Sequence, residues 1–209
     1  MPAELWTLEA DGYWRSDYDE TYSARDNYAY GTYRPDASTT GILSDRGDLT
    51  EVASNYTTLG PNEVIENKWF HGKLTIKHPN TIVRNCLFTA DNAGPSSPSY
   101  ASITAYDDVS SSTLVYDCTF ESSTGTVYAK NGIQGRDISV FRCDISGYVD
   151  GIGLQGENGR VEGCWIHDLV WFAWDPAQSD GFHIDGIQIH NGTYDVVRVK
   201  SFVLGYVST

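Results

Sequence analysis

The sequence predicts an all-β chain folded as a right-handed parallel β-helix of about six coils, with an irregular N-terminal segment. Three observations support this fold class. One seven-residue pattern recurs along the chain, every cysteine stands at its fifth position, and its residues are mostly β-branched or aromatic. The repeats are Val64–Phe70, Ile82–Phe88, Leu114–Phe120, Ser139–Ile145, Arg160–Ile166 and Val196–Phe202.

Each repeat carries Val or Ile at its second position, and most successive repeats are separated by too few residues for a helix-bearing unit. Each repeat therefore predicts one coil. The second and fifth positions both face inward only if the chain bends between them. Asn, Asp and Gly tolerate the left-handed backbone of such a bend, whereas Arg and Val fit it less well. The fourth-position residues are Asn67, Asn85, Asp117, Arg142, Gly163 and Val199.

The cysteines are predicted to form a reduced, buried column. Stacked coils place equivalent Cβ atoms about 4.8 Å apart, whereas a disulfide requires about 3.8 Å. No Cys-x-x-Cys pair suggests a metal site, and we expect neither a metal nor another cofactor. Lys68 and Lys200 take the cysteine position in the two outermost repeats, which predicts where the regular coils begin and end. The four cysteines are Cys86, Cys118, Cys143 and Cys164.

A second column precedes the first. Three coils contain Asn-Gly-Ile or Asp-Gly-Ile, and Ser102-Ile103 occupies a similar place in a fourth. The isoleucines Ile133, Ile152 and Ile187 are predicted to stack inward. The glycines indicate bends or close approach of the backbone. Asp150 is then expected to lie next to Asp185, one coil away.

Composition restricts the function and the organisation of the chain. Its 209 residues suit a single core, and a formal charge of −14 disfavours nucleic acid and anionic membranes as partners. No apolar run is long enough to span a membrane, and the first residues do not predict a secretory signal. Residues 1–35 are rich in Tyr, Asp and Arg and lack the repeat. They are expected to cap the solenoid or to dock to a larger assembly, while residues 36–209 form the β-helix domain.

The densest polar cluster runs from Ser179 to His190. Asp150 and Asp185, one strand spacing apart, are candidate catalytic carboxylates for glycoside hydrolysis, with Asp180 or His183 assisting. The alternative is an acidic ladder with only a structural role at a bend. The stretch His183–Gly186 is similar to an Asn-Thr-Asp-Gly motif of polygalacturonases, which share the β-helix, but their other motifs are absent in the expected order.

The insertion between the last two repeats is aromatic. Trp171, Phe172 and Trp174 are candidate carbohydrate-binding residues, because aromatic rings stack on sugars and solenoid loops often form the binding face. Packing on the flank of a coil and contact with another subunit are the alternatives.

Residues 41–190 resemble the right-handed, pectate-lyase-like β-helix minor tail proteins of actinobacteriophages. The similar stretches include Val64–Lys68, Ile82–Cys86, Val149–Gly153 and Ser179–Gln188. The resemblance implies a virion component near the tail tip that touches the host envelope, made in the host cytoplasm. It also makes a homotrimer an expectation.

Two functions are therefore expected from the sequence. The first is a structural tail-tip protein without turnover, which contacts other tail proteins through residues 1–35 and presents a surface to host cell-wall polysaccharide. The second is an envelope-polysaccharide depolymerase, a hydrolase or a lyase, that uses the paired carboxylates.

Overall fold

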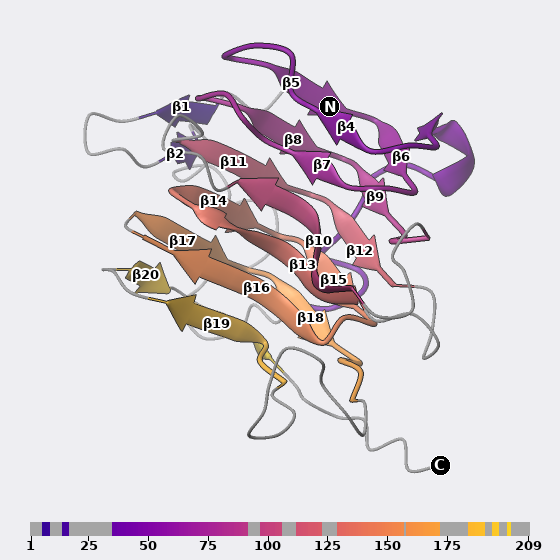
Figure 1. Ribbon diagram of the computed structural model, residues 1–209, viewed down its shortest axis with the longest axis vertical. Coiled ribbons are helices and arrows are strands. Elements are labelled where there is room, and N and C mark those ends of the chain that lie inside the picture. Colours follow the sequence, from indigo (N-terminus) through magenta and orange to yellow (C-terminus); the bar gives the residue numbers. More distant parts are fainter. Residues whose placement is uncertain are drawn as a thin grey trace.

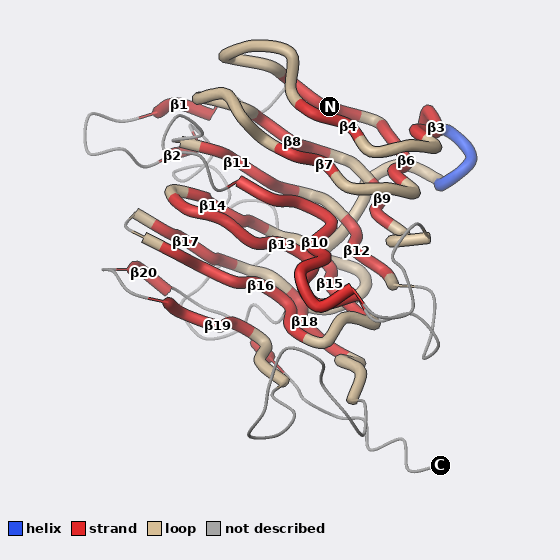
Figure 2. The backbone as a smooth tube through the Cα atoms, in the orientation of Figure 1, coloured by secondary structure: helices blue, strands red, loops and turns tan. Residues whose placement is uncertain are grey.

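A computed structural model describes residues 35–91, 97–105, 112–122, 129–156, 158–171 and 184–190, together with the backbone of short strands at 6–8, 14–16, 194–196 and 200–201 (Figure 2). Except for one 3-10 turn at Arg46–Asp48, the regular structure of these residues is entirely β. Strands β1 (Trp6–Leu8) and β2 (Trp14–Ser16) pair antiparallel as a separate two-stranded sheet. Apart from Pro35, the rest of the predicted capping or docking segment lies outside the described residues.

The remaining strands form three parallel sheets, and within each sheet the strands are stacked along the long axis of the molecule (Figure 1). Sheet 1 contains β3 (Thr50–Val52), β6 (Lys68–Phe70), β9 (Leu87–Phe88), β12 (Thr119–Glu121), β15 (Asp144–Ser146), β18 (Trp165–His167) and β21 (Lys200–Ser201). Sheet 2 contains β4 (Tyr56–Thr57), β7 (Leu74–Thr75), β10 (Ser97–Ala105), β13 (Ala129–Arg136), β16 (Asp150–Gln155) and β19 (Ile187–His190). Sheet 3 contains β5 (Val64–Glu66), β8 (Ile82–Arg84), β11 (Thr113–Tyr116), β14 (Ile138–Phe141), β17 (Gly159–Glu162) and β20 (Tyr194–Val196).

The order of the strands along the chain makes this a parallel β-helix. After β3, the chain visits sheets 2, 3 and 1 in turn, and it repeats that cycle from β4 to β21. Each cycle of three strands is one turn, so turn 1 runs from β4 to β6 and turn 6 from β19 to β21. The predicted fold class and its six coils are confirmed.

The strand register confirms five of the six predicted repeats and corrects the last. The second-position residues pair from turn to turn, from Ile65 to Val161. In turn 6, however, Val161 pairs with Val196 and Trp165 pairs with Lys200. Lys200 is therefore one place beyond the cysteine position. Val196 and Val197 are equally suited to an inward position, so the sequence could not distinguish two registers one residue apart.

The regular structure also begins earlier than the cysteine column predicted. Strand β3 pairs with β6, and β4 pairs with β7, so paired strands precede Lys68. Tyr56 of β4 packs edge-on against Phe70, and its hydroxyl donates to Glu63 at 2.6 Å. This contact helps to close the core at its first turn.

Left-handed residues form the predicted corner between sheets 3 and 1. All five described fourth-position residues have φ between 47° and 63°. They include Arg142, which the sequence suggested was a poor fit. A second left-handed column, not predicted, lies two residues before each repeat. It contains Asn62, Asn80, Ser112, Asp137 and Asn158.

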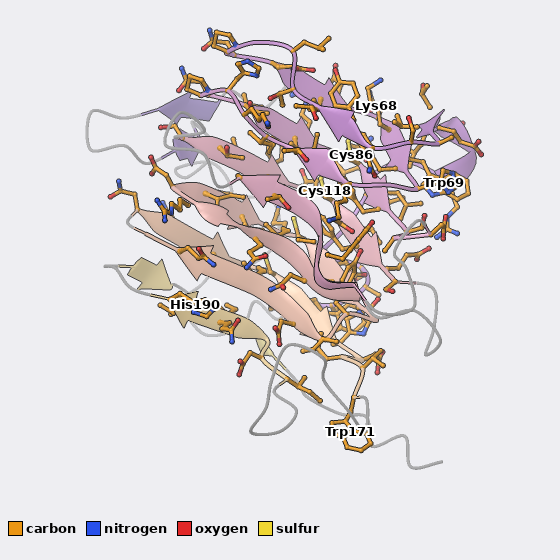
Figure 3. The ribbon with its side chains drawn as sticks, in the orientation of Figure 1. Lys68, Trp69, Cys86, Cys118, Trp171 and His190 are labelled. Atoms are coloured by element: carbon orange, nitrogen blue, oxygen red, sulfur yellow. The ribbon has the colours of Figure 1, made fainter. Side chains whose placement is uncertain are left out.

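The core is built from continuous columns of apolar side chains. Phe70, Phe88 and Phe120 stack face to face on successive turns, with ring centroids 4.8 and 4.7 Å apart. The four cysteines are free and fully buried, and Figure 3 shows Cys86 and Cys118 one turn apart. The ladder Leu74–Ile103–Ile133–Ile152 fills sheet 2 of the core, as the second predicted column requires.

Residues 41–46 form a strap that crosses the outside of the corner between sheets 3 and 1. Gly41 donates its N–H to the carbonyl of Arg142 in turn 4, at 2.9 Å. Leu43 donates to Asn85 Oδ1 in turn 2 at 2.7 Å, and Asn85 Nδ2 donates to Ser44 Oγ at 2.7 Å. The chain thus runs backward along the stack before it enters β3.

Candidate functional site

The predicted carboxylate pair is adjacent, but its two members differ in surroundings. Asp150 is fully buried, and its Oδ1 accepts a hydrogen bond from the backbone N–H of Asp185 at 3.0 Å. The Asp185 carbonyl in turn accepts from the N–H of Gly151 at 2.9 Å. Asp185 itself is only partly buried. The Asp150 carboxylate therefore serves as an acceptor for the backbone of the next turn.

The glycine of the Asp-Gly-Ile motif is required by close packing at this place. A Cβ atom on Gly151 would lie 2.5 Å from the carbonyl oxygen of Gly186 and 2.7 Å from Ile166 Cγ2. Real Cβ atoms do not approach backbone oxygen so closely. The motif thus positions the backbone of two turns, and its aspartate satisfies an N–H at the join.

The other predicted site residues are mostly outside the described chain. Asp180, His183, Phe172 and Trp174 fall there, so their assignments as catalytic or carbohydrate-binding residues stay predictions. Trp171 is described, and its side chain is 48 % exposed just beyond β18 (Figure 3). It can contact a partner from that position.

A cluster that the sequence analysis missed lies on the outer face of sheet 1. The sixth and eighth positions, counted from the start of each repeat, face away from the core, because they alternate with the buried seventh. Trp69 and His71 occupy them in turn 1, and Trp165 and His167 occupy them in turn 5. The repeated Trp-x-His spacing was visible in the sequence. Its significance depended on knowing which face the two positions share.

Each tryptophan packs against its own histidine. The Trp165 and His167 rings stack with centroids 3.6 Å apart, and those of Trp69 and His71 lie 4.8 Å apart. Trp69 of β6 also donates its Nε1–H to Thr89 Oγ1 at 3.1 Å (Figure 3 shows Trp69 on the right of the view). Both histidines also pair with aspartates: His71 with Asp91, and His167 with two carboxylates.

His167 lies between the carboxylates of Asp144 and Asp168. Its Nε2 is 2.9 Å from Asp144 Oδ1, and its Nδ1 is 2.7 Å from Asp168 Oδ2. Burial lowers the pKa of His167, but the hydrogen bonds and charges of the two aspartates outweigh it and raise the pKa above its ordinary value. Because both ring nitrogens are engaged, this histidine is an ion-pair centre and has no nitrogen left to act as a base.

Arg46 of the strap covers the tryptophan of turn 1. Its guanidinium carbon lies 5.2 Å from the centroid of the Trp69 ring, and the same group forms an ion pair with Glu121. The outer face of sheet 1 thus holds a cation between an indole and a carboxylate. A cation in this place gains a cation–π contact and an ion pair at the same time.

The described residues contain no group of three His, Cys, Asp or Glu side chains that could hold a metal ion. They also include no helix with the length and apolar character needed to cross a bilayer.

Comparison with known proteins gave no relative. No protein-family model, no curated protein and no solved structure matches the chain.

Proposed function

We propose that the chain is a structural component of a bacteriophage tail tip, which presents the side of its β-helix to the host envelope without catalysing a reaction. Its other expected contacts belong to the same proposal: residues 1–35 join it to neighbouring tail proteins, and three copies assemble as a trimer. The proposal rests on the resemblance of residues 41–190 to minor tail proteins, and on one observation of geometry.

That observation is the use of Asp150. Glycoside hydrolysis requires two carboxyl groups that both reach the substrate. Asp150 is fully buried and its Oδ1 is taken by the Asp185 N–H, so this carboxylate supports the join between turns 5 and 6. The acidic ladder then favours a scaffold over an active centre. The features available for contact are the outer side chains of sheet 1 and the exposed Trp171.

The rigidity of the solenoid fits a role in presentation. Each turn is bonded through its backbone to the next in all three sheets, and apolar columns run through the stack. A surface built on such a stack is already ordered before a partner binds. Little conformational entropy is then lost on binding a partner.

The experiment asks whether the protein is on the particle and touches the host. Antibodies raised against the purified chain should label tail tips in electron micrographs, and the purified chain should compete with phage for adsorption. A variant lacking residues 1–35 should keep the circular dichroism of the β-helix but fail to enter virions. Absence of labelling, or normal incorporation of the truncated chain, would contradict the proposal.

The depolymerase alternative is an outcome of a second assay. Purified protein is incubated with host cell-wall glycans, and new reducing ends or unsaturated products are measured. We expect none. Release that disappears in Asp185→Asn, but persists in Asp91→Asn on another face, would overturn the non-enzymatic role and establish the alternative.

A further inference from the structure

Two related sites, each built on a Trp-His ring pair, lie toward either end of the outer face of sheet 1. The turn 1 site comprises Trp69, His71 and Glu121, and the turn 5 site comprises Asp144, Trp165, His167 and Asp168. Both combine a Trp-His ring pair with a carboxylate, but its place differs. Glu121 lies two turns away from His71, whereas Asp168 directly follows His167 and pairs with it. The register places the two tryptophans in one column, four strand spacings or about 19 Å apart.

The turn 1 site has an occupant. Arg46 reaches it from the end of the strap, where the 3-10 turn Arg46–Asp48 begins. The guanidinium lies over the indole and pairs with Glu121, so it is bound by stacking and by charge together. Arginine suits this geometry better than lysine, because its planar group can stack and form a paired contact at once.

The turn 5 site offers the same chemistry. Among the described residues, no arginine or lysine lies over Trp165. Two carboxylates face one histidine there, so the cluster stays negative even when His167 is protonated. Asp168 is 73 % exposed in its side chain and is open to a group from solvent. Backbone register places Lys200 next to Trp165 in the column, so Lys200→Ala is the variant that tests for an internal cation.

We propose that the turn 5 site binds an arginine side chain carried by a segment of a protein partner, by stacking on the indole and pairing with a carboxylate as Arg46 does in the turn 1 site. The acidic charge of the cluster and of the whole chain attracts such a segment. Trp165 supplies the stacking surface, Asp168 supplies the paired carboxylate, and His167 holds both in place. This inference is independent of the proposed role in a tail, because it depends only on the geometry of the two sites.

The test uses the full chain and a minimal probe. The peptide acetyl-Gly-Arg-Gly-amide is titrated into ¹⁵N-labelled protein, and the tryptophan indole resonances are followed by NMR. The matched control peptide carries citrulline, which has the shape of arginine without its charge. The indole signal identified by its loss in Trp165→Leu should shift with the arginine peptide, and binding of the citrulline peptide should be at least about tenfold weaker.

Variants identify the groups that bind. Asp168→Asn should weaken the peptide about fivefold or more, and it keeps the test valid if Trp165→Leu does not fold. Arg46→Ala should empty the turn 1 site, so that the Trp69 signal also shifts and the stoichiometry rises from one peptide to two. An unchanged Trp165 signal, equal binding of the citrulline peptide, or binding that appears only in Lys200→Ala would each overturn the proposal. The last result would identify Lys200 as the resident cation.

Discussion

The guanidinium of Arg142 in turn 4 forms a two-pronged ion pair with the carboxylate of Asp117 in turn 3. Its Nε lies 2.7 Å from Oδ1, and its Nη2 lies 2.8 Å from Oδ2. Both residues stand at the left-handed corner between sheets 3 and 1, and Asp117 is buried. The pair links two turns at the point where the backbone of each is most constrained, so an arginine is held in a conformation it rarely adopts.

Loss of this pair should be costly. Arg142→Asn keeps a residue that tolerates the left-handed corner but leaves the Asp117 carboxylate buried and uncompensated. We expect the free energy of unfolding, measured in urea, to fall by about 3–5 kcal/mol. Arg84→Gln is the control, because its pair with Glu66 is much more exposed and should contribute less than about 1 kcal/mol. Equal losses in the two variants would show that the corner pair has no special weight.

The aromatic stack should depend on its middle ring. Phe88 lies between Phe70 and Phe120 and is fully buried. Phe88→Ala leaves a cavity and removes two ring contacts, so we expect a loss of about 3–5 kcal/mol in the free energy of unfolding. Leu59→Ala is the matched surface change. Since Leu59 is 82 % exposed, its replacement should stay within about 0.5 kcal/mol of wild type.

Gly147 should be irreplaceable, and Gly60 should not. Gly147 has φ of 74°, and an added Cβ would lie 2.4 Å from the carbonyl oxygen of Ser122. Gly147→Ala should therefore lower the thermal midpoint by an amount equivalent to about 2 kcal/mol or more. At Gly60 a Cβ meets nothing within 4 Å, and Gly60→Ala should be neutral or stabilising by up to about 1 kcal/mol. A tolerated Gly147→Ala would refute the close approach of these two turns.

The cysteine column should resist thiol reagents until the protein unfolds. Burial raises the pKa of the Cys118 and Cys164 thiols, and none of the four side chains is accessible. A colorimetric disulfide reagent should find no reactive thiol in the folded chain and four after denaturation. Fast reaction of even one thiol under native conditions would contradict the stacked column.

His167 should make stability depend on pH. Its folded pKa is raised, so protonation favours the folded state. That contribution is complete below the ordinary histidine pKa of about 6.5 and is lost as pH rises through the higher folded pKa. The gap in unfolding free energy between wild type and His167→Gln should thus be larger at pH 5.5 than at pH 9. A gap that stays constant or grows with pH would show that the imidazole is not charged between Asp144 and Asp168.

Much of the fold could be predicted because residues at the same place in successive turns are of the same type and stack on one another. Val83, Val115 and Val140 each precede a cysteine by three residues, which marks their place in the repeat. Their registers were predicted correctly. Turn 6 lacks that marker, and adjacent valines left its register ambiguous by one residue. The column containing Asn80 was missed, although its residue types suit a left-handed bend, because it lies outside the repeated segment.

The site was less predictable, because it depends on which side of a turn is covered. Asp150 looks the same in sequence whether it faces solvent or the N–H of the next turn, and only the stack decides. Trp69 and Trp165 were separated by four turns and became one surface only when the strands were aligned. Arg46 could not be linked to Trp69 at all, because the strap runs against the direction of the coils.

The backward course of the strap also has a consequence for the order of events during synthesis. Turns can be added one by one as the chain emerges, each using the previous one as a template. The strap precedes them all, yet its acceptor at Arg142 exists only after turn 4 has been made. Residues 41–46 must therefore wait while the solenoid grows beneath them, and their closure is a late step. Residues 41–46 are translated before the six turns, yet they are among the last residues to reach their native contacts.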